Sequence, residues 1–205
     1  MIDRLRGGPL SSSVIVRNVA RGAGFMLRKE HGVRWTVDET EFRAGLAGKT
    51  RFTTQEGVRF RVSPKETRAA FISRWDSFDP RLVVPLDRRG VRTVYLLTAG
   101  TTEVMQTHIE NVRLLARYTE GDEVVLDLVN PSNYDDSIGS FGFQHTSRVP
   151  AVWLSRNAHL DVYAMRTDPG RVLASLEAEV LSQGIIFGVV AITLETAGNA
   201  GTHGR

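Results

Sequence analysis

Apolar and polar residues alternate along short segments through most of this chain. In residues 112–118 every second side chain is apolar, and the alternation resumes in residues 124–128. Residues 119–123 connect the two segments and contain Gly121. A period of two is that of an extended strand with one buried face, and a short loop with a glycine joins many β-hairpins. The pattern predicts an antiparallel hairpin over residues 112–128.

The same alternation recurs between turns that contain glycine or proline, and each recurrence predicts a strand. The last predicted strand, IIFGVVAITL, is almost continuously apolar, so we expect it to lie at the centre of a sheet with both faces buried. Many short strands at this spacing favour an all-β sandwich or barrel. Besides the hairpin, the predicted strands are residues 33–37, 58–62, 71–74, 82–86, 94–98, 149–154, 160–165, 172–180 and 185–194.

Length and turn content predict one folded domain. A chain of 205 residues fits one large β domain. Residues 1–24 are rich in glycine and predict an irregular lead-in, residues 25–195 predict a single β-sandwich domain, and the small, polar residues 196–205 predict a flexible tail.

Composition narrows the partners and the chemistry. No run of 18 apolar residues is present, so we expect no membrane partner. The first residues lack the apolar core of a signal peptide, and the compartment stays open: secreted or periplasmic if the chain is part of a longer protein. The chain has no cysteine, which excludes disulfides and thiolate metal sites.

The charge is distributed unevenly along the chain. The net charge is +3, yet residues 1–92 carry 19 Arg and Lys against 10 Asp and Glu. These basic residues are dispersed, often two positions apart as in Arg59 and Arg61, which is the spacing of one solvated strand face. A nucleic-acid footprint needs clustered basic residues, so we expect no nucleic-acid partner.

Four segments carry a resemblance to a known family: WDSFDPRLVVPL, VYLLTAGTTEVMQTHIEN, YTEGDEVVLDLVNPSNY and the closing VVAITL. They resemble the C-terminal β-sandwich of large bacterial proteins associated with polysaccharide breakdown. The likeness covers residues 60–194 and is most specific at Met105-Gln106 and at Asn130-Pro131 with Asn133. It implies a jelly-roll sandwich similar to galactose-binding domains and an accessory role without catalysis. The chain departs from the family at Tyr134, where members often have Trp.

The loop of residues 130–136 is the first candidate site. Sugars present hydroxyl groups around apolar ring faces, so a sugar site combines amides and carboxylates with an aromatic ring. The same oxygen-rich loop would suit Ca²⁺, the one cofactor left open, and Asn, Asp, Pro and Ser also simply form turns. The candidate ligand-binding residues here are Asn130, Asn133, Tyr134, Asp135 and Asp136.

A second candidate loop holds Arg74, Trp75 and Asp76 at the end of a predicted strand. Trp75 could stack on a sugar while its neighbours bind hydroxyl groups, although a Trp at a strand end also packs into sandwich cores. We expect the two loops to lie close together and form a shallow groove. In that groove Trp75 or Tyr134 would supply the stacking surface, and Asn133 and Asp135 the polar contacts.

An enzymatic alternative rests on His108 and Glu110, which would point the same way on a strand and could join His145 or His159 in a cupin-like metal site. The second histidine of the usual pair is missing, so no metal ligand is assigned. No nucleophile or phosphate-binding motif is present, and no catalytic residue is assigned. Glu177 and Glu179 share one strand face, which we expect to be solvated.

These observations predict an all-β, jelly-roll, galactose-binding-like sandwich that serves as a non-catalytic carbohydrate-binding or accessory module. Its expected partners are a carbohydrate and a neighbouring domain or a second subunit. The alternatives are the cupin-like metalloenzyme and a purely structural or interaction domain.

Overall fold

The structure, a computed structural model, describes residues 12–14, 48, 50–62, 70–74, 78–101, 106–135, 137, 151–154 and 159–197. None of these residues is helical, and every pairing between the named strands is antiparallel. No helix in this part of the chain has the length and apolarity to cross a bilayer. The all-β class predicted from the alternation is confirmed.

The smaller of the two main sheets has four strands in the order β5-β11-β7-β8. The predicted hairpin is confirmed: β7 ends at Tyr118, β8 begins at Glu123, and the Tyr118 amide donates to Asp122 O at 2.8 Å. Gly121 has φ of 98°, a conformation that glycine adopts without strain. The strands are β5 (Arg81–Arg89), β7 (Glu110–Tyr118), β8 (Glu123–Val129) and β11 (Val172–Val180).

The larger sheet has six strands built around β12 (Ile186–Thr196). On one side β12 pairs with β6 (Val91–Thr101), and the sheet continues through β10 (His159–Arg166) to β9 (Val152–Trp153). On the other side β12 pairs with β1 (Ser12–Val14) and β4 (Ala70–Ser73), so part of the expected lead-in belongs to this sheet. The strand predicted at residues 33–37 lies outside the described residues.

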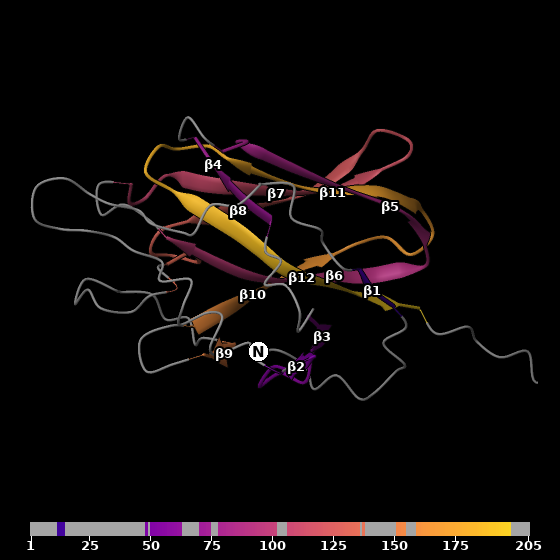
Figure 1. Ribbon diagram of the computed structural model, residues 1–205. Helices are drawn as coiled ribbons and strands as arrows, with labels where there is room; N and C mark the ends of the chain where they lie inside the picture. The colour runs from indigo at the N-terminus through magenta and orange to yellow at the C-terminus, as the bar shows by residue number, and fades with distance from the viewer. Residues whose placement is uncertain are drawn as a thin grey trace, which may run out of the picture.

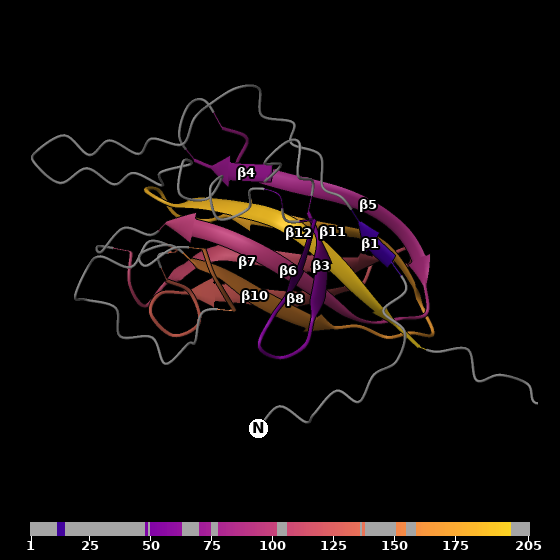
Figure 2. The same ribbon diagram turned by 60° about the horizontal axis from the view of Figure 1, so that its bottom comes forward.

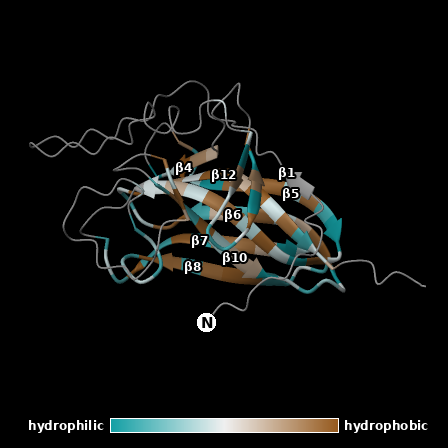
Figure 3. Cartoon of the chain, turned by 90° about the horizontal axis from the view of Figure 1, so that it is seen from below, coloured by the Kyte–Doolittle hydropathy of each residue, from teal (hydrophilic) through white to brown (hydrophobic). Residues whose placement is uncertain are grey.

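The two sheets stack as the layers of a β-sandwich and share one apolar core (Figure 1). The side chains predicted to face inward from the hairpin do so: Val112, Leu114 and Ala116 are fully buried. Apolar residues are concentrated on the strands of both layers (Figure 3). Removal of this surface from water is the main force that holds the sheets together.

A third layer covers the outer face of the larger sheet. It is a two-stranded hairpin of β2 (Arg51–Thr53) and β3 (Arg59–Arg61), and it lies across that sheet (Figure 2). Its apolar side chains pack on β6, β10 and β12, and Thr193 Oγ1 donates to Arg59 O at 2.6 Å. The second core contains Phe52, Val58, Phe60, Tyr95, Leu97, Leu160, Val190 and Ala191.

This third layer explains the composition of β12. Phe187, Ile192 and Leu194 face the core between the sheets, whereas Val190 and Ala191 face the hairpin. The prediction that residues 185–194 form a central strand buried on both faces is confirmed.

The outer face of the smaller sheet carries a buried carboxylate. Glu177 on β11 is 5% exposed, and the expectation of a solvated face is wrong for this residue. It forms ion pairs with Arg81 of β5 and with Arg117 of β7, the latter at 3.0 Å. Burial alone would raise the pKa of Glu177, but the hydrogen bonds from the two arginines outweigh it and hold the pKa below its ordinary value. Glu177 therefore links three adjacent strands.

Replacing Glu177 with Gln should lower the free energy of unfolding at pH 7 by about 1 to 3 kcal/mol, because it removes charge-assisted hydrogen bonds. The lowered pKa means that this stabilisation is fully present above the unfolded-state value of about 4.3 and is lost as the pH falls through the folded-state value. Urea unfolding of both proteins should therefore show a difference that shrinks from pH 7 toward pH 3.

Glu179→Gln is the matched control, because it makes the same charge change two residues away on the same strand face. Glu179 is only partly buried, so its replacement should cost under about 0.5 kcal/mol. Equal losses in the two variants would contradict a specific role for the Glu177 ion pairs.

Candidate ligand-binding site

The two candidate loops begin at the same end of the sandwich. Ser73, at the end of β4, donates its hydroxyl to Ile185 O at 2.6 Å, and the Tyr134 hydroxyl donates to Ile186 O at 3.3 Å. Ser137 joins this end through two bonds with Gly100: its amide donates to Gly100 O and its Oγ accepts from Gly100 N, each at 2.8 Å. The start of β12 and the end of β6 thus contact the described ends of both loops.

Tyr134 belongs to the core and not to the surface. Its side chain is 2% exposed, and its ring meets the edge of Phe187 with centroids 6.2 Å apart. Gly100 permits this position, since a Cβ there would collide with the Tyr134 hydroxyl. The expectation that Tyr134 provides a sugar-stacking surface is wrong, because the ring fills the apolar space between the sheets.

The asparagines of the loop bond to backbone. Asn133 Oδ1 accepts from Val129 N at 2.7 Å, and Asn133 Nδ2 donates to Asp127 O at 2.9 Å. β8 is the end strand of its sheet, so the Asn133 amide takes the place that the peptide group of a further strand would occupy. Asn130 Nδ2 donates to Tyr134 O at 3.2 Å within the same loop. These contacts are turn chemistry, one of the alternatives left open by the sequence.

The structure describes only some of the remaining predicted ligand residues. Asp135 is 7% exposed, so its carboxylate belongs to the buried end of the sandwich rather than to an open groove. Arg74 is exposed, and its Nε donates to Val180 O at 2.8 Å, which ties this loop to the end of β11. Trp75, Asp76 and Asp136 lie outside the described residues.

The geometry expected for the cupin-like alternative is not found. His108 precedes β7 and has a left-handed backbone with φ of 60°, so the expected alternation with Glu110 on one strand is wrong. The His108 amide donates to Asn130 O at 2.7 Å. The side chains of His108 and Glu110 are both exposed. His159 is buried on β10, and His145 lies outside the described residues. Within the described ranges, no three His, Asp or Glu side chains are grouped to hold a metal ion.

An aromatic residue that the sequence analysis did not single out lies at the rim of the larger sheet. Trp153 on β9 is 52% exposed and stands opposite His159 on β10. The two rings meet edge to face, with centroids 5.2 Å apart. The sequence signal for an exposed Trp153 is the alternation in residues 152–154. It places Trp153 on the opposite strand face from Val152, which packs toward the second core.

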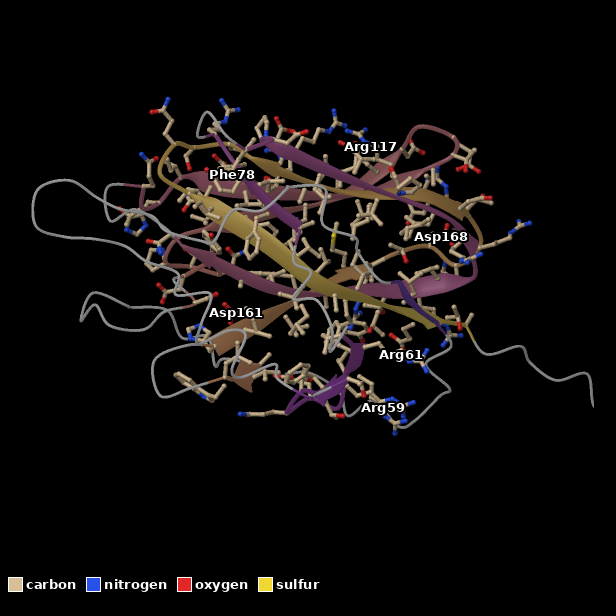
Figure 4. All side chains as sticks on the ribbon, viewed as in Figure 1. Arg59, Arg61, Phe78, Arg117, Asp161 and Asp168 are labelled. Atoms are coloured by element: carbon tan, nitrogen blue, oxygen red, sulfur yellow. The ribbon has the colours of Figure 1, made fainter. Side chains whose placement is uncertain are left out.

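Buried polar groups lie directly behind Trp153. His159 Nε2 is 3.7 Å from Asp161 Oδ2, and both residues are under 10% exposed. The His159 amide donates to Ser137 O at 2.8 Å, and Thr98 Oγ1 donates to Asp161 O at 3.3 Å. Figure 4 places Asp161 at the same side of the molecule as β9. Trp153 therefore rests on a part of the fold that is fixed by hydrogen bonds.

The comparisons with known proteins give no relative on which to base an assignment. No protein family, no curated protein and no solved structure matches this chain significantly.

Replacing Asn133 with Ala should lower the free energy of unfolding by about 1 to 2 kcal/mol, because two backbone groups at the edge of β8 lose their partners. Ser132→Ala, in the same loop at an exposed position, should change it by under about 0.5 kcal/mol. Chemical denaturation measures both. An unchanged midpoint for Asn133→Ala would contradict the role of its amide in closing the sheet edge.

Proposed function

We propose that this chain is a non-catalytic carbohydrate-binding module, acting as an accessory domain of a glycan-processing protein. The observation that carries the proposal is Trp153, a large aromatic ring that is 52% exposed at the rim of a rigid sheet. An exposed indole offers a flat apolar surface on which a ligand can stack.

The chemistry of sugars suits this position. A pyranose ring has an apolar face that stacks on a flat indole, and its hydroxyl groups bond to nearby polar side chains. Contact with His159 and the strand pairing of β9 with β10 fix the orientation of Trp153. A ring held in place before binding loses little conformational entropy when the ligand arrives. The sequence predicted Trp75 or Tyr134 as the stacking residue, and we propose Trp153 for this role.

Glu177 and Asp161, two buried carboxylates in the described part of the chain, do not form a glycosidase pair. Glycosidases need two carboxyl groups on opposite sides of a scissile bond, one of which is kept protonated. Glu177 is held ionised by two arginines and lies on the outer face of the smaller sheet, so it is unsuited to donate a proton. Asp161, on the larger sheet, is paired with His159.

The finer description of the fold is also part of the proposal. We take the sandwich to be a jelly roll similar to galactose-binding domains, in line with the resemblance of residues 60–194 to accessory domains of polysaccharide-degrading proteins. A neighbouring domain would pack on the outer face of the smaller sheet, where Val83 and Val125 are each nearly half exposed.

Replacing Trp153 with Ala should weaken binding to a neutral polysaccharide at least tenfold, a loss of about 1.4 kcal/mol. Affinity electrophoresis in gels that contain xylan, β-glucan, galactan or starch identifies the ligand and measures the change. Trp153→Tyr should retain much of the binding, since it keeps a flat ring.

Tyr134→Phe is the control for that experiment, because it removes a buried hydroxyl and leaves Trp153 in place. It should lower the melting temperature without changing glycan binding. The proposal fails if wild-type protein binds none of the polysaccharides, or if Trp153→Ala binds as well as the wild type.

A further inference from the structure

The outer face of the β2–β3 hairpin carries three exposed arginines: Arg51, Arg59 and Arg61. Arg51 stands directly opposite Arg61 across the two strands, and Arg59 follows two residues away on the same strand face. Within the part of the chain that the structure describes, no carboxylate forms an ion pair with any of them. Arg59 and Arg61 lie on the side opposite to Arg117 (Figure 4).

Four arginines at the smaller sheet have carboxylate partners. Arg81 and Arg117 share Glu177, Arg113 meets Asp127 at 2.6 Å, and Arg171 lies 3.0 Å from Asp122. Opposite charges thus meet at these positions of the smaller sheet, whereas the hairpin brings charges of one sign together. Charges of the same sign directly opposite each other destabilise a strand pair.

The inner face of the hairpin fixes the arginines in this unfavourable arrangement. Phe52 and Phe60 are 6% and 1% exposed in the second core, so the hairpin cannot turn its arginines away. The strand geometry sets Arg51 and Arg61 about 5 Å apart at Cβ and Arg59 about 7 Å from Arg61. Guanidinium groups at that spacing can each bind a carboxylate or sulfate group through two hydrogen bonds.

We propose that Arg51, Arg59 and Arg61 form a binding site for an acidic glycan, one that carries carboxylate or sulfate groups. The bound anions would neutralise the like charges of the hairpin. The choice of a glycan rests on the proposed function, but the site does not use Trp153.

Two observations favour a glycan over a nucleic acid. Both phenylalanines of the hairpin face inward, so its outer face offers no ring on which bases could stack. Among the described residues the site comprises three arginines, fewer than the roughly 6 to 10 phosphate contacts of a strongly salt-dependent DNA-binding protein. The paired arginines of the smaller sheet do not extend this positive surface.

The test measures binding of the full chain to heparin, to polygalacturonate and to a single-stranded DNA oligonucleotide over a range of salt concentrations. The triple variant Arg51→Gln, Arg59→Gln, Arg61→Gln should bind at least tenfold more weakly to heparin or polygalacturonate. Its salt dependence should be less steep by about three counterions, one for each contact removed.

A matched control removes three other exposed arginines: Arg88 and Arg89 at the end of β5, and Arg92 at the start of β6. This variant changes the net charge by the same amount and should bind the acidic glycans like the wild type. An equal loss in the control would overturn the site, since binding would then follow net charge alone. DNA bound as tightly as the glycans through the same three arginines would overturn the ligand class.

Thermal melting supplies a second readout. Heparin should raise the melting temperature of the wild type and of the control, but not that of the hairpin variant, because only a ligand of the folded state stabilises it. If the triple variant does not fold, Arg61→Gln alone should reduce the salt dependence by about one counterion. An unchanged salt dependence in Arg61→Gln would contradict the proposal. Neutral polysaccharides test Trp153, so either site can fail without the other.

Discussion

The burial of β12 on both faces is the constraint on which the rest of the structure depends. Its side chains contribute to the core between the two sheets and to the core beneath the hairpin, and its backbone pairs with β6 on one side and with β1 and β4 on the other. Gly188 is paired with Phe71 of β4, and a Cβ at this position would collide with the Phe71 ring. A strand without a polar face can be stable only if a layer covers each side, so the three-layer arrangement follows from its composition.

The need to satisfy buried polar groups determines the structure at the end of the sandwich where the two loops begin. Amide and hydroxyl groups that would otherwise be buried without partners, or left open at a strand edge, bond to the backbone of their own loop or of the neighbouring strands, as Asn133, Ser137 and Ser73 do. Side chains used in this way are not available to a ligand. Under the proposed function, recognition would fall to groups that do not serve the fold in this way, such as Trp153 at the rim.

Much of the fold could be predicted from the sequence, because alternation reports directly on which face of a strand is buried. The predicted bounds of residues 172–180 coincide with β11, and the hairpin of β7 and β8 has its predicted turn. Alternation does not show what covers a buried face. The pattern around Phe60 therefore predicted a strand, but not that this strand belongs to a third layer. The role of the loop of residues 130–136 was harder to predict, because Asn and Tyr suit a ligand site and a turn equally well. Only Gly100, far away in sequence, makes room for Tyr134.

The contrast among the arginines shows why charge must be judged in three dimensions. Along the sequence, Arg59 and Arg61 lie in one predicted strand and Arg81 directly precedes another, and nothing local shows which of them has a carboxylate partner. In the fold, Arg81 meets Glu177 because β5 and β11 are adjacent, whereas β2 and β3 pair only with each other and bring arginine opposite arginine. An ion pair between neighbouring strands offsets the cost of desolvating its own charges, and its field does not extend far into solvent. The field of unpaired arginines held at a fixed spacing extends further, so the proposed site on the hairpin would attract an anion from solution.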